Sequence, residues 1–305
     1  MKTKKGIEDF NQFEPEYLIS VMDRHEDWCT IVCLIGGGQE INTGEAGVSE
    51  WIESLKNKFL DWDIYFSDKI LCEQTTYLND NELLNWLESN GNKETDLHLS
   101  VSIRSFRSEK IALFVQKLLD DNPIEANSIY NSIKNNYLIC LTRDLKKAKN
   151  WLKKSAKGSE RIGIIASSGA RRLKAEGINV KNEISPADWF LNPKDDVRSS
   201  YFLEDIATEF DIQGLEIDFA CLAWDINLYY DNGWKYQNFK GNKWYNVNKE
   251  ASKKYLLNAY RVLLTRARQG MVIYVPEVDD SDWTRPKYQY DSTYGYLESC
   301  GLDIL

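Results

Sequence analysis

The chain has 305 residues, of which 43% are hydrophobic and 12% aromatic, and its formal net charge is −9. This composition supports a packed core, so a wholly disordered protein is excluded. The length fits one large domain or two ordinary ones. The negative charge argues against a protein that coats nucleic acid by bulk electrostatic attraction.

The sequence contains no membrane span, secretory signal or metal-binding pattern. No apolar stretch approaches the roughly 20 residues that cross a bilayer, and the first residues lack an apolar signal segment. Six cysteines are scattered, mostly within apolar runs, which is typical of reduced core thiols. His25, Cys29 and Cys33 recur at four-residue intervals, but a strand there would separate their side chains, so no metal site is predicted. We expect a cytoplasmic protein with no membrane partner.

The first third of the chain begins with an amphipathic helix pattern at residues 14–22. A continuous apolar run at 28–35 then ends in three glycines, which predicts a strand buried on both faces. Apolar residues at helical spacing follow at 45–59. The polar stretch 89–96 has no such pattern, so a domain boundary is predicted between residues 90 and 97.

The rest of the chain alternates between strand and helix patterns. The predicted strands are 99–104, 137–142, 161–167, 214–224 and 271–275, and the predicted helices are 109–119, 145–156, a short one after Gly169, and 251–269. Residues 225–248 form an aromatic-rich insert, where Asn232-Gly233 and Gly241-Asn242 predict tight turns in a small meander. Such alternation predicts an α/β fold with a parallel sheet flanked by helices.

Two regions offer contacts to nucleic acid. Residues 143–181 contain twelve Lys or Arg and three Asp or Glu, which fits either a solvated helix face or a strip that binds phosphates. Arg171, Arg172 and Lys174 are the candidates in the second interpretation. In the aromatic insert, Trp234 and Trp244 either stack on bases or form a satellite core.

Four segments occur in an order that resembles motifs III, IV, V and VI of superfamily 1 helicases. They are residues 34–40 (LIGGGQE), 102–104 (SIR), 213–216 (QGLE) and 264–268 (LTRAR). The longer strings at 38–47 and 258–268 resemble the bacterial Schlafen group 3-like DNA/RNA helicase domain, over about residues 14–300. The resemblance implies a RecA-like parallel sheet flanked by helices, with 1–96 as the tail end of a first lobe and 97–305 as a second lobe.

The resemblance also implies roles for individual residues. Gln39, Arg104 and Arg266 would be catalytic: Gln39 would contact both a γ-phosphate and water, Arg104 would face the nucleotide, and Arg266 would be the arginine finger. Gly38, Gly214, Glu216 and Arg268 would bind the cofactor, with Glu216 accepting a ribose hydroxyl. On a helix over 251–269, Arg266 would project roughly 140° from Arg261, so the two arginines would serve different purposes.

The chain departs from the family pattern in one respect. It contains no Gly-x-x-x-x-Gly-Lys-Ser/Thr string, and the 27 residues before Trp28 contain no Walker B strand that ends in an acidic pair. ATP and Mg²⁺ are therefore expected only with the missing first-lobe motifs, supplied by the same gene or by a separate chain, and the chain alone is expected to be inactive. Single-stranded or duplex DNA or RNA is the expected partner.

Two alternatives remain at this point. A degenerate helicase fold could serve as a non-hydrolysing module that binds nucleic acid or protein. A magnesium-dependent nuclease could use acidic residues of one region, Glu204, Asp205, Glu209, Asp211, Glu216 and Asp218, but no lysine of the usual kind lies nearby.

Overall fold

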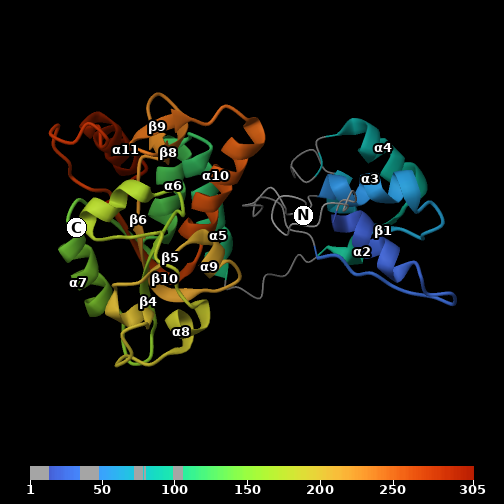
Figure 1. The fold of residues 1–305 in the computed structure, drawn as a ribbon, viewed down its shortest axis with the longest axis horizontal. Helices are drawn as coiled ribbons and strands as arrows, with labels where there is room; N and C mark the ends of the chain where they lie inside the picture. The colour runs from blue at the N-terminus through green and yellow to red at the C-terminus, as the bar shows by residue number, and fades with distance from the viewer. Residues whose placement is uncertain (1–13, 35–47, 72–77, 79, 99–105) are drawn as a thin grey trace. The chain divides into compact units, whose positions relative to one another are not determined.

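The structure is a computed structural model that describes residues 14–34, 48–71, 78, 80–98 and 106–305. The chain forms two compact units, residues 1–101 and 102–305 (Figure 1). Among the described residues, no helix combines the length and the apolar character needed to cross a membrane.

Unit 1 is a small helical body. Its helices are α2 (Glu14–Met22), α3 (Val48–Lys58) and α4 (Asn81–Asn90), and its two short parallel strands are β1 (Tyr65–Ser67) and β2 (Asn92–Glu94). The 3-10 turns η1 (Asp68–Leu71) and η2 (Thr95–Leu97) complete it. Its core contains Val48, Ile52, Phe66, Leu78, Leu83 and Leu87. The predicted helix at 14–22 is confirmed.

The apolar run at residues 28–34 is not a strand. The side chains of Trp28, Val32 and Leu34 are 80%, 79% and 81% exposed. A buried strand needs neighbours that satisfy its backbone groups, and the described part of unit 1 places no strand beside this run. The predicted buried strand was therefore wrong for these residues, because hydrophobicity does not by itself supply a pairing partner.

Unit 2 is built on a six-stranded parallel sheet in the order β11-β3-β10-β6-β4-β5. Its strands are β3 (Leu138–Thr142), β4 (Ile162–Ala166), β5 (Ile206–Ala207), β6 (Ile217–Ala223), β10 (Ala267–Tyr274) and β11 (Asp303–Ile304). The α/β fold with a parallel sheet flanked by helices is confirmed.

Helices cover both faces of this sheet (Figure 1). The helices are α5 (Phe106–Leu119), α6 (Pro123–Ile133), α7 (Leu145–Ser155), α8 (Pro186–Leu191), α9 (Glu209–Ile212), α10 (Glu250–Leu264) and α11 (Lys287–Ser299), with η3 (Arg171–Glu176) and η4 (Ser200–Phe202) as 3-10 turns. In β3, Ile139 and Leu141 pack in the core with α5, α6, α10 and α11, whereas Cys140 packs on the opposite face with α7. Side chains alternate between faces along a strand, so each central strand contributes to two cores.

A three-stranded antiparallel sheet follows β6 and corresponds to the predicted meander. Its strands are β7 (Leu228–Tyr230), β8 (Trp234–Lys240) and β9 (Lys243–Asn246). Asn232, Gly233 and Gly241 adopt positive φ angles of 46°, 111° and 61°, as tight hairpin turns require. Both predicted turns are confirmed.

Candidate nucleotide and nucleic-acid sites

The amino ends of two neighbouring strands, β6 and β10, bring the motif V and motif VI segments together. Ile217 at the start of β6 is the register partner of Ala267 at the start of β10. The backbone N–H of Ile217 donates a hydrogen bond of 3.1 Å to the carbonyl oxygen of Arg266. Because the strands are parallel, the loops that precede them lie at the same edge of the sheet. Four predicted site residues therefore share this edge, namely Gly214, Glu216, Arg266 and Arg268.

Arg266 lies inside the protein and is 1% exposed. Its Nε donates to the carbonyl of Val262 over 3.1 Å, and its Nη1 donates to the carbonyl of Leu215 over 3.5 Å. Its Nη2 donates to Oγ1 of Thr265 over 3.3 Å. The guanidinium thus connects the end of α10 to the loop before β6. A planar group with five donors is well suited to such a junction.

Arg266 and Arg268 lie beyond α10, which ends at Leu264, and β10 already begins at Ala267. In the last helical turn, Oγ1 of Thr265 hydrogen-bonds to the carbonyl oxygens of Arg261 and Val262. This type of side-chain bond competes with continued helix. The predicted helix to residue 269 was too long, and the 140° angle between Arg261 and Arg266 does not apply.

Arg268 belongs to a polar cluster centred on Asp218. Its Nη2 donates to Oδ1 of Asp218 over 2.7 Å, and Nε2 of Gln269 donates to the same oxygen over 3.0 Å. The backbone N–H of Arg161 donates to Oδ2 over 2.7 Å. Burial acts to raise the pKa of Asp218, but these three hydrogen bonds outweigh it and hold the pKa below the usual value. The side chain of Arg268 is nevertheless 58% exposed, so it still faces solvent.

Gly214 and Glu216 lie in the loop before β6. Gly214 has a φ of 83°, and no heavy atom lies within 4 Å of the position that a Cβ would occupy. Such a left-handed glycine leaves room for close approach of a ligand to the backbone. Glu216 is half-buried. The pKa of Arg268 is raised mainly by its hydrogen bond to Asp218 and by the charge of Asp218, and the charge of Glu216 raises it further.

The remaining predicted nucleotide-site residues, Gly38, Gln39 and Arg104, lie outside the described residues. Their roles stay predictions.

The carboxylates of the nuclease alternative are held by separate partners. Lys149 pairs with Glu204, Asn182 donates to Asp205, and Ser168 donates twice to Glu209. Asp211 accepts from Thr208 in a capping box. In the part of the chain that the structure describes, no group of three or more His, Cys, Asp or Glu residues could hold a metal ion. Nothing in this region therefore favours a two-metal nuclease.

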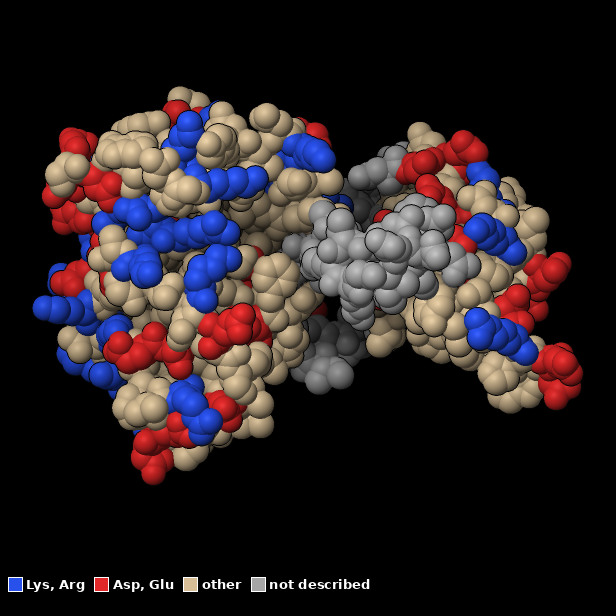
Figure 2. Space-filling view, viewed as in Figure 1, with Lys and Arg blue, Asp and Glu red and all other residues tan. Residues whose placement is uncertain are grey.

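The predicted basic residues Arg171, Arg172 and Lys174 lie on η3, just after the carboxyl end of β4. Nη1 of Arg171 donates to the carbonyl of Phe239 over 3.1 Å, and the Arg172 guanidinium lies 5.3 Å from the centroid of the Phe239 ring. Arg171 and Lys174 are exposed. In Figure 2, Lys and Arg side chains gather on the visible face of unit 2.

The two tryptophans predicted to stack on bases are partly buried. Trp234 stacks on Trp224 at a centroid distance of 5.6 Å, and its Nε1 donates to the carbonyl of Leu118. Nε1 of Trp244 donates to the carbonyl of Thr284 over 2.8 Å. Both rings thus hold the small sheet against the rest of unit 2, and their role toward bases stays a prediction.

The sequence model of the family described as "Schlafen group 3, DNA/RNA helicase domain" matches residues 2–277, which is most of the chain. No curated protein matches the sequence significantly.

Proposed function

Because the chain belongs to the Schlafen group 3 DNA/RNA helicase domain family, we propose that unit 2 is a RecA-like second lobe of a nucleic-acid-dependent ATPase. The observation that carries this proposal is the pairing of β6 with β10, which joins the 213–216 and 264–268 segments at one edge of the sheet. In this proposal unit 1 is the tail end of the first lobe. The phosphate loop comes from a first lobe in the same gene or in a separate chain.

The described residues fit part of an ATP site. Arg268 would offer a solvent-facing guanidinium to a phosphate, Arg266 would do so after leaving its carbonyl partners, and the backbone at Gly214 is open to approach. Glu216 would accept a hydrogen bond from the ribose. The ligands of Mg²⁺ would come from the first lobe, and the metal would neutralise charge on the phosphates.

Arg266 has to change its contacts to act as a finger. Its guanidinium is bound to the carbonyls of Val262 and Leu215. We propose that closure of the two lobes draws the guanidinium toward the γ-phosphate, which releases the loop that contains Leu215. Binding of nucleotide would then change the conformation of both loops at this edge of the sheet. This change would couple ATP hydrolysis to the affinity for nucleic acid.

The test is reconstitution. The 305-residue chain is mixed with a first-lobe polypeptide that carries a phosphate loop, and ATP hydrolysis is measured with and without DNA or RNA oligonucleotides. Hydrolysis that requires both polypeptides and rises with nucleic acid supports the proposal. Hydrolysis by the first lobe that is unaffected by this chain argues against it.

A non-hydrolysing binding module is the second candidate. The 1% exposure of Arg266 favours it, since a buried arginine bound to carbonyls can serve as a purely structural tie. In that case the chain binds nucleic acid or protein without a first lobe, and substitution of Arg266 lowers stability without altering any hydrolysis.

A further inference from the structure

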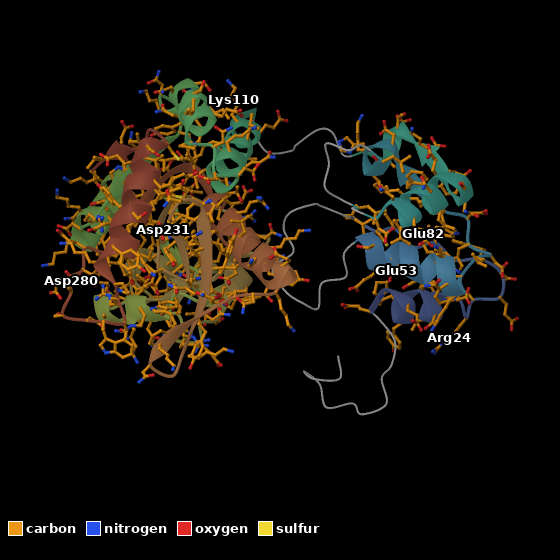
Figure 3. All side chains as sticks on the ribbon, turned by 90° about the horizontal axis from the view of Figure 1, so that it is seen from above. Arg24, Glu53, Glu82, Lys110, Asp231 and Asp280 are labelled. Atoms are coloured by element: carbon orange, nitrogen blue, oxygen red, sulfur yellow. The ribbon has the colours of Figure 1, made fainter. Side chains whose placement is uncertain are left out.

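An exposed tryptophan lies in the loop between β10 and α11. Trp283 is 65% exposed, although burial of a side chain this large is strongly favourable. Its two neighbours in the chain are fixed. Asp282 accepts a hydrogen bond of 2.7 Å from Nη2 of Arg172, and the carbonyl of Thr284 accepts from Nε1 of Trp244 over 2.8 Å. The ring is therefore presented from a loop that is anchored on both sides. In Figure 3, Asp280 marks this loop at the rim of unit 2.

The anchors of this loop belong to two basic elements. Arg172 comes from η3, which also carries the exposed Arg171 and Lys174. Trp244 comes from the β8–β9 hairpin, whose turn is flanked by the exposed, directly paired Lys240 and Lys243. Nη1 of Arg171 donates to the carbonyl of Phe239 in β8, so η3 and the hairpin are in contact.

The hairpin presents one face to the protein and the other to solvent. Phe239 and Trp244 are cross-strand partners that pack edge to face, at a centroid distance of 5.1 Å. Lys240, Lys243 and Tyr245 are exposed, and Nζ of Lys243 lies 5.4 Å from the centroid of the Tyr245 ring. The hairpin therefore adds charge and a second aromatic ring, 47% exposed, to this surface.

Four cations of this surface make no ion pair among the described residues, although the loop that presents Trp283 also carries the carboxylates of Asp279, Asp280 and Asp282. Within the described ranges, no carboxylate lies within ion-pair distance of Arg171, Lys174, Lys240 or Lys243, whereas Asp282 is already paired with Arg172. Cations without an ion-pair partner attract phosphates, and a flat exposed indole offers a stacking surface for a base.

We propose that Trp283, with Arg171, Lys174, Lys240 and Lys243, forms a binding surface for single-stranded nucleic acid. The cations contact backbone phosphates, and Trp283 stacks on an unpaired base. A single strand is favoured over a duplex because the bases of a duplex are stacked on one another and unavailable to an indole. The proposal deepens the proposed function by locating where unit 2 holds its nucleic acid, and it rests on that function.

The experiment measures binding of the 305-residue chain, without ATP or any partner, to fluorescent oligo-dT and oligo-U over a range of salt concentrations. Trp283→Ala is compared with Phe202→Ala, an exposed aromatic side chain on η4. The double substitution Lys240→Glu/Lys243→Glu is compared with Lys153→Glu/Lys154→Glu on the exposed face of α7. A backbone of abasic sites, which has phosphates but no bases, serves as a second probe.

Trp283→Ala is expected to weaken binding of oligo-dT or oligo-U about 5- to 150-fold, as for the loss of one stacked base. It is expected to leave binding of the abasic backbone unchanged, and Trp283→Phe is expected to restore part of the affinity. Lys240→Glu/Lys243→Glu is expected to weaken both probes and to lower the salt slope by at least about 1.4.

Several results would overturn the proposal. The first is that no single strand binds at low salt, and the second is that the wild type and Trp283→Ala bind with equal affinity. The others are that a duplex binds more tightly than a single strand, or that only the α7 variant loses binding. Binding of anionic lipid vesicles in place of oligonucleotides would also overturn it, because a tryptophan among lysines suits that surface too. The binding measurements do not depend on ATP hydrolysis by the reconstituted pair. A failure of the ATPase proposal and a failure of the binding proposal can therefore be told apart.

Discussion

The N–H of Ile217 donates to the carbonyl oxygen of Arg266 over 3.1 Å, which joins the loops before β6 and β10 at the amino edge of the sheet. The Arg266 side chain strengthens this connection through the carbonyl of Leu215. A change in the contacts of Arg266 would therefore alter the loop of Gly214 and Glu216, because Leu215 lies between these two residues. In the proposed function, this connection would let one nucleotide contact two motifs that are about 50 residues apart.

Gly214→Ala is expected to lower both stability and nucleotide-dependent activity. At a φ of 83° an L-residue is strained, which costs about 1 to 2 kcal/mol. Gly177→Ala is the matched control, because Gly177 has a φ of 81° and equally open surroundings at the end of η3. Denaturant unfolding should show similar decreases in the free energy of unfolding for the two variants. Only Gly214→Ala should reduce ATP hydrolysis in the reconstituted system, and equal activity losses would contradict the role of Gly214.

Arg268→Ala is expected to destabilise the protein at neutral pH but not in acid. Hydrogen bonds hold the pKa of folded Asp218 below its ordinary value of 3.8 despite its burial. A lowered carboxyl pKa stabilises the fold above the unfolded value, and this contribution is lost as the pH falls through the folded pKa. The free energy of unfolding of Arg268→Ala should therefore be lower than that of the wild type at pH 7, and this difference should shrink as the pH falls below about 3.8. NMR titration should show a higher pKa of Asp218 in the variant. A deficit that does not change with pH would exclude this ion pair as its cause.

Tyr290→Phe is expected to lower the free energy of unfolding by about 1 kcal/mol. The Tyr290 hydroxyl donates to Oδ1 of the fully buried Asp225 over 2.6 Å, and the N–H groups of Ile226 and Arg172 donate to the same carboxylate. Asp225→Ala removes the acceptor of all three donors and should cost about 3 kcal/mol or more.

The control for this pair is Tyr288→Phe, because Tyr288 is 60% exposed. The free energy of unfolding of Tyr288→Phe should match that of the wild type within about 0.5 kcal/mol. Equal losses for Tyr288→Phe and Tyr290→Phe would show that the buried network does not stabilise the start of η3.

The parallel sheet was predictable because its strands are short apolar runs between helix patterns. The predicted strand 137–142 and helix 145–156 match β3 and α7 closely, since Asp144 caps α7 with hydrogen bonds to the N–H groups of Lys146 and Lys147. Residues 28–34 carry the same apolar signal without a partner strand among the described residues. Local pattern specifies a tendency to form a strand, and pairing decides whether the strand forms.

The candidate site was predictable only in part. The motif segments identified Gly214, Glu216, Arg266 and Arg268, and the structure brings these together. The end of α10 was misplaced because residues 262–275 are apolar enough for either helix or strand, and pairing of Ala267 with Ile217 decides the outcome. Trp283 was not identified, because a sequence does not show which tryptophan is left exposed after the others have packed.

The most direct test of the central claim is ATP hydrolysis by the reconstituted pair of polypeptides with Arg266→Ala in this chain. Arg261→Ala is the matched control, because Arg261 lies on α10 and contacts Asn258. Arg266→Lys shows whether charge alone suffices. The account predicts that Arg266→Ala lowers the turnover rate about 10³-fold or more while the chain remains folded by circular dichroism. Turnover of Arg266→Ala equal to that of Arg261→Ala would contradict it.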